Sequence, residues 1–229
     1  MLTMPKGKFI ILDGIDGSGK TTQLALLKEW LEKEEGKQII SFDFPQYSEF
    51  WGKMAGRFLS GEFGGIDEVS PYLVSPLYFL DQASCASKIT AALNEGKWVL
   101  SNRYLSSSLI HQTARIKDDS AKLEFRNWLM DAAYNVAGLY REDLVIALKV
   151  SPEISIIKAK EAKARKSYAK VDIAEENFDH LLSSSLELNY CATNLPNWEV
   201  VNCMSENATL LSVIEVQEKI RSIIRTKYF

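Results

Sequence analysis

The residues with the clearest chemical potential form one contiguous stretch, Gly14–Thr21, which reads G-x-x-x-x-G-K-T. Its glycines allow backbone N–H groups to turn inward around a phosphate, because no Cβ stands in the way. Lys20 is long enough to reach the β- and γ-phosphates of a nucleotide, and the hydroxyl of Thr21 can join the ligands of a Mg²⁺ ion. We therefore predict a phosphate-binding loop made of Gly14, Asp16, Gly17, Ser18, Gly19, Lys20, Thr21 and Thr22.

The flanking sequence places this loop between a strand and a helix. Residues 8–12 form a short apolar run typical of a buried strand, and the helical pattern over 22–35 puts Leu24, Leu27 and Leu31 on one face. A helix that begins at the loop adds its partial positive charge to the phosphate site. An ordinary tight turn is the alternative interpretation. The pattern alone does not separate GTPases, motor ATPases and small kinases.

The composition is that of an ordinary globular protein and argues against several other classes. The chain has 229 residues, of which 46% are hydrophobic and 25% charged, so we expect a single α/β domain over residues 1–229. A net charge of −3 argues against nucleic acid as a partner. No apolar run approaches the roughly 20 residues that span a bilayer, and the N-terminus lacks an apolar signal-peptide core. We therefore expect no membrane partner.

Three cysteines, Cys85, Cys191 and Cys203, are scattered along the chain. Their odd number and the lack of C-x-x-C spacing indicate neither a disulfide framework nor a zinc site. We expect them to be reduced thiols in a cytoplasmic protein.

Strand-like runs alternate with helical patterns along the chain. The apolar runs fall at 8–12, 37–42, 97–101, 143–148 and 198–201. Helical patterns fall between and after them, at about 71–94, 105–114, 119–137, 152–167, 173–190 and 207–226. This alternation predicts an α/β fold with a parallel sheet between layers of helices. Ligands of such sheets lie at the carboxyl ends of the strands.

Two short motifs follow predicted strands and are therefore expected at that edge. Phe44-Pro45-Gln46-Tyr47 offers an aromatic ring, fixed by the following proline, for stacking on a base; a buried turn is the alternative. The Phe44–Pro45 bond is a candidate for a cis peptide, a form that about 5% of such bonds adopt. Ser101-Asn102-Arg103-Tyr104 offers the guanidinium of Arg103 to a phosphate; a surface arginine paired with a carboxylate is the alternative.

A basic run covers residues 158–170. Its cations are Lys158, Lys160, Lys163, Arg165, Lys166 and Lys170. Glu161 is the single acidic residue within the run. Such a run is usually a solvated helix face. The functional alternative is a mobile lid over about 158–172, which brings cations over a transferring phosphoryl group and excludes water.

Taken together, these motifs resemble the thymidylate kinases, which are nucleoside-monophosphate kinases of the P-loop class. The matching stretches follow the family's order: LDGIDGSGKTTQ at 12–23, FPQY at 44–47, LSGEFG at 59–64, YFLD at 78–81, NRYLSSS at 102–108 and DIAE at 172–175. The resemblance implies a three-layer P-loop NTPase fold, with a five-stranded parallel sheet flanked by helices, and a homodimer. It also implies transfer of the γ-phosphoryl group of ATP to dTMP, giving dTDP and ADP, with Mg²⁺ as cofactor.

The resemblance assigns roles on the acceptor side. Phe44 is expected to stack on the pyrimidine, Arg103 to hold the 5′-monophosphate of the acceptor, and Asp16 to accept a hydrogen bond from the 3′-hydroxyl of the deoxyribose. Tyr47 and Tyr104 are expected beside the sugar. The expected substrate-binding set, with Ser108 near the base, is Asp16, Phe44, Pro45, Tyr47, Gln82, Arg103, Tyr104, Ser108, His111 and Gln112.

The expected catalytic set combines the donor and acceptor sides. Phosphoryl transfer requires positioning and charge neutralisation more than covalent chemistry. Some members of the family carry an arginine inside the loop where this chain has Gly17, so the cation is expected from the lid, first from Arg165 and second from Lys166. The catalytic residues are then Lys20, Arg103, Arg165 and Asp16, and the lid residues are Lys163, Arg165, Lys166, Asp172 and Glu175.

Several positions depart from the family's pattern. Asn102 replaces the aspartate of an Asp-Arg pair and loses its charge, so we expect Mg²⁺ at Thr21, partly through water, with Asn102 as a second candidate. Gln82 replaces an arginine that reaches the base, although its amide can pair with a thymine imide. His111 replaces a tyrosine, and a structural role is the alternative to substrate contact. Gln112 keeps the family's residue.

These departures leave other functions open. One is a kinase for another nucleoside monophosphate, such as dUMP or a modified pyrimidine deoxynucleotide. A deoxynucleoside kinase would need a general base rather than a phosphate-binding Arg103. A GTPase switch would need an Asn-Lys-x-Asp motif, which the chain lacks. A nucleotide-binding pseudo-kinase is favoured by Asn102 and Gln82 but opposed by Lys20 and Arg103.

Overall fold

The computed structural model describes residues 6–165 and 178–229, with only the backbone described over residues 159–165. Five strands form one sheet: β1 (Phe9–Gly14), β2 (Ile39–Asp43), β3 (Trp98–Asn102), β4 (Leu144–Lys149) and β5 (Trp198–Asn202). Neighbouring strands all pair in parallel, in the order β2-β3-β1-β4-β5. The predicted five-stranded parallel sheet is therefore confirmed, and β1 places the loop that follows it at the middle of the sheet.

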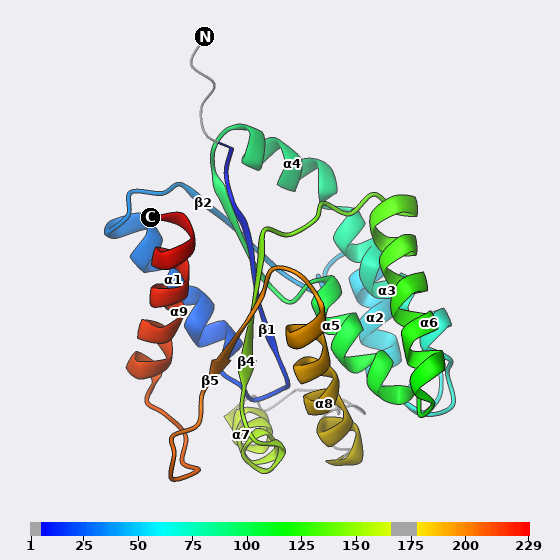
Figure 1. The fold of residues 1–229 in the computed structure, drawn as a ribbon. Helices are drawn as coiled ribbons and strands as arrows, with labels where there is room; N and C mark the ends of the chain where they lie inside the picture. Colours follow the sequence, from blue (N-terminus) through cyan, green and yellow to red (C-terminus); the bar gives the residue numbers. More distant parts are fainter. Residues whose placement is uncertain (1–5, 166–177) are drawn as a thin grey trace.

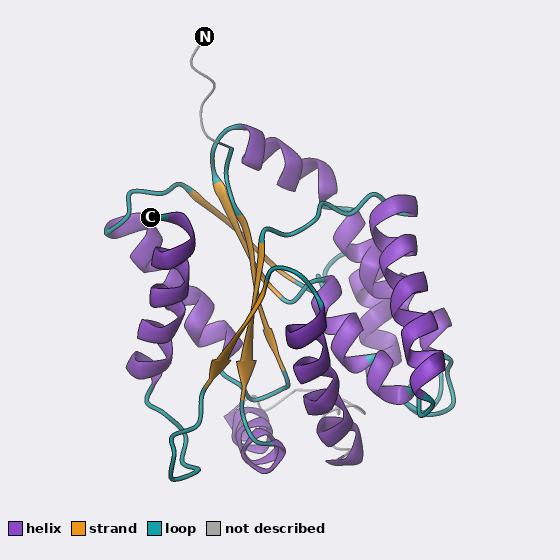
Figure 2. Ribbon diagram, viewed as in Figure 1, coloured by secondary structure: helices purple, strands orange, loops and turns teal. Residues whose placement is uncertain are grey.

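Helices cover both faces of the sheet and give the fold three layers (Figures 1 and 2). In chain order they are α1 (Lys20–Lys33), α2 (Phe50–Leu59), α3 (Pro71–Ala83), α4 (Ala86–Asn94), α5 (Leu105–His111), α6 (Asp119–Met130), α7 (Pro152–Arg165), α8 (Phe178–Asn194) and α9 (Val213–Tyr228), with a 3₁₀ turn at Thr113–Arg115 and a π-helical turn at Asp131–Val136. Helices α1 and α9 lie on one face, while α5 and α8 lie on the other, with α3 and α6 beyond them.

The side chains of β1 explain why the sheet is covered on both faces. Successive side chains of a strand point to opposite sides. Phe9 and Ile11 pack with residues of α5 and α8, whereas Ile10 and Leu12 pack with residues of α1 and α9. All four side chains are fully buried, which is why this run is continuously apolar in sequence.

The predicted helices are present, and several of their ends differ from the prediction, although the predicted end at 167 and the predicted start at 173 lie outside the described residues. The pattern over 71–94 belongs to two helices, α3 and α4, rather than one. The last helix begins at Val213 instead of about 207, because Ser212 and Glu215 form a capping box at its N-terminus. Helical periodicity identified these segments, and in α9 a side-chain cap marks where the helix begins.

Helix α2 was not predicted, and its glycines explain both why it was missed and what it does. Gly52 and Gly56 lower helix propensity. A Cβ on Gly52 would lie 2.0 Å from the carbonyl oxygen of Gln46, and one on Gly56 would lie 3.1 Å from the ring of Tyr47. The two glycines therefore let the loop after β2 pack directly against the helix.

The carboxyl ends of β1, β2 and β3 lie at one edge of the sheet. Asn102 pairs in register with Leu12 on β1 and with Asp43 on β2. The residues that follow each strand therefore leave the sheet at the same level. This register brings together the phosphate-binding loop, the Phe44 motif and Arg103, as the sequence predicted.

Two expectations about the whole chain can be compared with the structure. Cys85, Cys191 and Cys203 are buried and unpaired, as expected for free thiols. Among the residues that the structure describes, no helix has the length and apolar character needed to cross a bilayer.

Candidate active site

The predicted phosphate-binding loop closes around the side chain of Lys20. Helix α1 begins at Lys20, directly after Gly19 in the left-handed region at φ 88°. The Lys20 ammonium is buried and donates to the carbonyl oxygens of Gly14 at 2.9 Å and Ile15 at 3.0 Å. The Ser18 hydroxyl is buried without a hydrogen-bond partner in the described structure. The loop therefore holds a cation and an unsatisfied polar group where phosphates are expected.

Gly14 is required by the close approach of two strands. It has φ 143°, and a Cβ there would lie 2.4 Å from the carbonyl oxygen of Leu148 at the end of β4. A side chain at this position would push the loop away from the sheet. The glycine thus fixes the loop against β4, while its N–H group donates a hydrogen bond to the side chain of Asp13.

Asp13 connects the loop to the start of α5. Its carboxylate accepts hydrogen bonds from the backbone N–H of Gly14 at 2.8 Å and from the hydroxyl of Ser107 at 2.9 Å, and it also accepts from Ser106. Asp13 is fully buried. Asp13 therefore ties the phosphate-binding loop to the start of α5.

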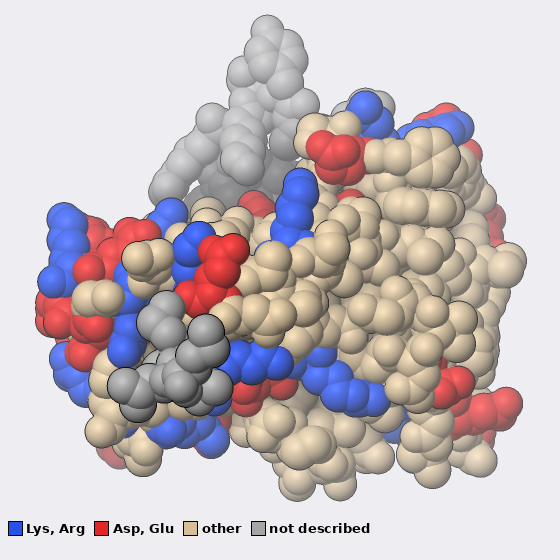
Figure 3. All heavy atoms as spheres, turned by 90° about the horizontal axis from the view of Figure 1, so that it is seen from above, with Lys and Arg blue, Asp and Glu red and all other residues tan. Residues whose placement is uncertain are grey.

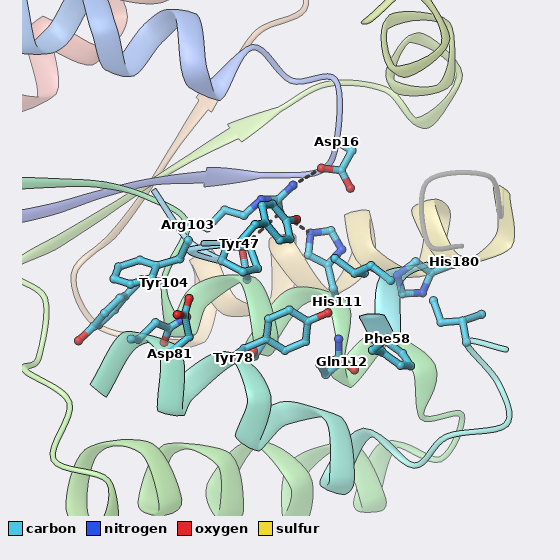
Figure 4. A pocket seen from close by; sticks show the side chains of 17 residues that line it. Asp16, Tyr47, Phe58, Tyr78, Asp81, Arg103, Tyr104, His111, Gln112 and His180 are labelled. Carbon is cyan, nitrogen blue, oxygen red and sulfur yellow. Dashed lines mark hydrogen bonds and ion pairs between the residues drawn. The ribbon is translucent and has the colours of Figure 1, made fainter. Parts of the chain in front are cut away.

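Arg103 lies at the point where the two sides meet. It follows β3 with φ 63°, a left-handed conformation that is unusual for a residue with a side chain, and its N–H donates to the carbonyl oxygen of Leu12 at 3.0 Å. Its guanidinium pairs with Asp16 in the loop and donates to the Ser107 hydroxyl at 3.3 Å (Figure 4). The backbone turn directs the side chain toward the loop, where it pairs with a carboxylate.

Asp16, Lys20 and Arg103 form one cluster of charges. The Lys20 ammonium lies 3.7 Å from an Asp16 carboxylate oxygen. Burial alone would raise the pKa of Asp16, but the charges of Arg103 and Lys20 outweigh it and hold this pKa far below its usual range. Burial, together with the charge of Arg103, lowers the pKa of Lys20 to about 8. The pKa of Arg103 is raised, because the Asp16 charge outweighs its burial.

A pocket opens beside this cluster, and every residue predicted to bind substrate lines it. The lining includes Asp16, Phe44, Pro45, Tyr47, Gln82, Arg103, Tyr104, Ser108, His111 and Gln112. Figure 4 shows side chains from several elements converging on this space. The structure therefore brings these residues together, while the role of each toward a nucleotide is a proposal.

The aromatic residues of the pocket differ in what they can offer. Phe44 is buried against Phe42, with the two rings stacked at 5.9 Å, and the Phe44–Pro45 bond is cis, as the sequence suggested. Tyr104 is fully buried, and its hydroxyl donates to the carbonyl oxygen of Tyr140 at 3.1 Å. Only its ring therefore faces the pocket. Tyr47 is 57% exposed and lies at the pocket's mouth.

Two histidines that line the pocket, His111 and His180, lie beside the hydroxyl of the same serine. His111 Nδ1 lies 3.2 Å from the Ser184 hydroxyl, His180 Nε2 lies 3.5 Å from the same oxygen, and His111 Nε2 lies 3.5 Å from Arg103. Burial lowers the pKa of His111 well below its usual value and that of His180 to about 4. Both imidazoles are therefore neutral at pH 7 and can donate or accept a hydrogen bond without adding charge.

The sequence analysis missed several residues that line the pocket. These are Phe58, Leu59, Ile66, Tyr78, Asp81, Ser107 and His180. Leu59, Tyr78 and Asp81 lie inside stretches that matched the family, so their positions were available. Phe58 belongs to the unpredicted α2. His180 has no local signal, because only packing of α8 against α5 brings it to the pocket.

The residues present fit a magnesium ion held chiefly by phosphates and water. Mg²⁺ usually takes only one or two protein ligands beside its phosphates. Thr21 is exposed in the first turn of α1. The side-chain oxygen of Asn102 is buried without a hydrogen-bond partner, while its amide nitrogen donates to Asp43 at 2.7 Å. Among the described residues, no three metal-binding side chains form a cluster.

The predicted lid lies largely outside the described residues. Lys166, Asp172 and Glu175 fall in the gap between 165 and 178, and the side chains of Lys163 and Arg165 are not described. The start of α7, which leads to this segment, lies against the phosphate-binding loop. The buried hydroxyl of Ser155 donates to the backbone carbonyl of Asp16, so the helix is anchored on the phosphate-binding loop.

The fold and site together define a P-loop phosphotransferase of the nucleotide kinase class, with a lysine-bearing loop on one side and an arginine-lined pocket on the other. The model of the thymidylate kinase family matches residues 12–202 of the chain. The chain therefore belongs to the thymidylate kinase family.

Individual relatives agree with this assignment. The chain is 33% identical over 225 residues to a probable thymidylate kinase of Pyrococcus abyssi. The aligned region covers 96% of this chain and 97% of that relative. It is 33% identical over 164 residues to a thymidylate kinase of Prochlorococcus marinus, and the aligned region covers 68% of this chain and 72% of that relative. The fold also matches a thymidylate kinase structure from Candida albicans, with a TM-score of 0.71 and 20% identity over 96% of this chain and 92% of the other.

Proposed function

We propose that this protein transfers the γ-phosphoryl group of ATP to dTMP, giving dTDP and ADP. The observation that carries the proposal is the Lys20–Asp16–Arg103 cluster, which joins the phosphate-binding loop to the second pocket. A donor phosphate on the loop and an acceptor phosphate on Arg103 would then meet at one point. Positioning of this kind supplies much of the rate enhancement in phosphoryl transfer.

On the donor side, the loop holds the phosphate chain of ATP. The N–H groups of the loop and the N-terminus of α1 supply hydrogen bonds and partial positive charge. Lys20 currently bonds to the carbonyl oxygens of Gly14 and Ile15, so its ammonium only has to exchange these partners for phosphate oxygens. This exchange replaces neutral acceptors with charged ones and favours the bound state.

On the acceptor side, Arg103 binds the 5′-phosphate and Asp16 binds the sugar. Asp16 is ionised because its pKa is held low, so its carboxylate can only accept hydrogen bonds, as a 3′-hydroxyl requires. Phe44 offers its ring to the base, while Gln82, Ser108 and Gln112 supply polar atoms at the base edge. Binding of the acceptor phosphate would draw Arg103 partly away from Asp16 and free that carboxylate for the sugar.

Mg²⁺ is the proposed cofactor, and when bound it neutralises charge on the β- and γ-phosphates. Thr21 and the unpartnered oxygen of Asn102 are the groups that would hold it. Asn102 is neutral, and the nearby carboxylate belongs to Asp43. The remaining cation at the transferring group is proposed to come from the lid, first from Arg165 and second from Lys166.

We expect the enzyme to be a cytoplasmic homodimer without a nucleic-acid or membrane partner. Charged side chains gather over the side of α1 and α9 and are sparse over the side that carries α3 and α6 (Figure 3). On that side Phe50 is 68% exposed, Leu73 71% and Leu123 51%. Light scattering coupled to size exclusion should give a dimer mass, and Leu73→Glu should shift it toward the monomer; a monomeric wild type would contradict the expectation.

An assay of ADP release tests the proposed activity. The purified protein is given ATP and Mg²⁺ with one nucleoside monophosphate at a time, which is dTMP, dUMP, dCMP or dGMP. The control reaction contains no acceptor. ADP formed mainly with dTMP, and dTDP identified as its partner product, supports the proposal. Equal or greater turnover of dUMP would indicate a broader pyrimidine kinase. No turnover with any acceptor, despite ATP binding, would leave a nucleotide-binding pseudo-kinase.

A further inference from the structure

Arg115 ties together three walls of the acceptor pocket. It lies in the 3₁₀ turn directly after α5, and its guanidinium donates to the side-chain oxygen of Gln112 at 2.5 Å. The same group donates to the backbone carbonyls of Ile66 and Val69 in the loop before α3. It also lies over the Phe58 ring of α2, at 5.6 Å from the ring centre. No role for this residue followed from the sequence.

The chemistry of arginine fixes which way the Gln112 amide faces. A guanidinium carries donors and no acceptor, so only the oxygen of Gln112 can face it. The nitrogen of the amide is then turned the other way, toward the pocket space beside Tyr78 (Figure 4). A hydrogen bond from a cation to the amide oxygen also polarises the amide and strengthens its N–H groups as donors.

The oriented Gln112 amide is the donor on which the discrimination depends. Gln82 also lines the pocket, but its side-chain oxygen is buried beneath the surface with no hydrogen-bond partner among the described residues. A base edge that carries a carbonyl, such as that of thymine or uracil, accepts a hydrogen bond from the Gln112 amide. Cytosine places an amino group where the carbonyl would be, so donor would face donor.

We infer that Arg115 is a positioning residue for base selection: it holds the Gln112 amide with its nitrogen toward the acceptor and so makes the pocket prefer pyrimidines with a carbonyl at that edge. The inference rests on the proposed function, because it requires a nucleoside monophosphate in this pocket. Without Arg115 the amide can turn over and offer its oxygen to an amino group. The discrimination is then lost even if the pocket keeps its shape.

The main test is Arg115→Met, which keeps the apolar contact with Phe58 and removes the donors. The measurement is kcat/KM for dTMP and for dCMP, with the inhibition constant of dCMP against dTMP where dCMP turnover is too slow. We expect the preference for dTMP to fall about tenfold, the equivalent of one hydrogen bond. Arg115→Lys keeps a charged donor and should retain more of the preference than Arg115→Met.

Arg57→Met is a matched control. Arg57 also supports the loop before α3, through its pair with Glu62 at 2.7 Å, and it lies 5.0 Å from the centre of the Phe63 ring. It is exposed and does not line the pocket. Its substitution should leave the ratio of dTMP to dCMP efficiency unchanged. A change equal to that of Arg115→Met would attribute the effect to the loop and overturn the inference.

Gln112→Glu tests the same idea without removing Arg115. The carboxylate keeps a partner in Arg115 but turns an acceptor toward the pocket in place of the N–H groups. The preference should therefore move from dTMP toward dCMP, and dCMP should bind more tightly relative to dTMP than in the wild type.

If Arg115 only supports the fold, both nucleotides should lose efficiency in the same proportion in Arg115→Met.

The outcomes separate the inference from the proposed function. A wild type that forms no ADP with dTMP would overturn the proposed kinase activity. A wild type that prefers dTMP, together with unchanged preference in both Arg115→Met and Gln112→Glu, would overturn only the role of Arg115. Loss of preference in Arg115→Met with reversal in Gln112→Glu supports the inference.

Discussion

The proposed donor and acceptor halves of the site are built in different ways. The donor half is one contiguous stretch, residues 14–21, whose backbone groups and one lysine line the phosphate site. The acceptor half is assembled from side chains of the loop after β2 and of α2, α3, α5 and α8. Phosphate groups are the same in every nucleotide, so backbone N–H groups can hold them. Distinguishing one base from another needs side chains with specific donors and acceptors.

This difference explains where the chain departs from its family. The phosphate-binding loop keeps its G-x-x-x-x-G-K-T pattern, whereas Gln82 and His111 line the pocket. Asp16 and Arg103 belong to both halves, since they pair across the boundary between the loop and the pocket. Substitutions in the loop should therefore stop the reaction, while substitutions in the pocket should change which acceptor is used.

The largest expected effect comes from Lys20→Ala. Removing this ammonium from the loop should lower kcat by at least about a hundredfold, because charge stabilisation at the transferring group is lost. Circular dichroism and thermal melting should show an intact fold. Lys33→Ala, at an exposed lysine of the same helix that pairs with Glu29 at 2.6 Å, is the matched control and should leave kcat unchanged. Near-normal activity in Lys20→Ala would remove the loop from the mechanism.

Arg103→Met should damage the acceptor half more than the donor half. We expect kcat/KM for dTMP to fall about a hundredfold, because a bidentate contact with phosphate is lost and the Asp16 carboxylate loses its main partner. The affinity for ATP, measured by calorimetry without acceptor, should change far less. Arg141→Met is the control, since that guanidinium lies 4.0 Å from the centre of the Tyr134 ring. Equal losses for ATP and dTMP would contradict the division into two halves.

The electrostatic link between the halves should appear in the pH dependence of ATP binding. Burial and the charge of Arg103 lower the pKa of Lys20 to about 8, and a lysine is charged only below its pKa. The contribution of Lys20 to the ATP affinity of the free protein should therefore be nearly constant below about pH 7, and the affinity should fall by about tenfold by pH 9. In Arg103→Met the charge that helps to lower the pKa of Lys20 is gone. The loss of ATP affinity should therefore begin at a higher pH in this variant. An unchanged profile in that variant would show that the halves are not coupled.

The smallest expected effect is that of Gln82→Arg, which restores the family's residue. If the side chain reaches the base, the ratio of kcat/KM between dTMP and dUMP, or the KM of the acceptor, should change by about threefold to tenfold. The KM of ATP should stay the same. Gln38→Arg introduces the same charge at an exposed position and serves as the control. Unchanged kinetics would mean that Gln82 does not touch the base.

Much of the fold was predictable because its signals are local. The five apolar runs became the five strands, and β1 reads as continuously apolar because both of its faces are covered. Helix α2 was missed because Gly52 and Gly56 weaken its pattern, although tertiary contact with the loop after β2 requires them. The start of α9 depended on the pairing of Ser212 with Glu215, a detail that periodicity does not report.

The candidate site was predictable to the extent that its residues sit in motifs. The residues expected to bind substrate all line one pocket, because each lies in or close to a stretch shared with the family. His180 and Arg115 were not found. His180 reaches the pocket only through the packing of α8, and Arg115 acts on carbonyl groups almost 50 residues away in sequence.

The sequence by itself determined the phosphate-binding loop, because glycine geometry, a strand before it and a helix after it are all encoded within about twenty consecutive residues. Only the tertiary structure decided how the acceptor pocket is oriented. The pairing of Arg103 with Asp16 and the turn of the Gln112 amide depend on contacts between distant segments. Hydrogen-bond direction is a property of partners in space, and no spacing along the chain specifies it.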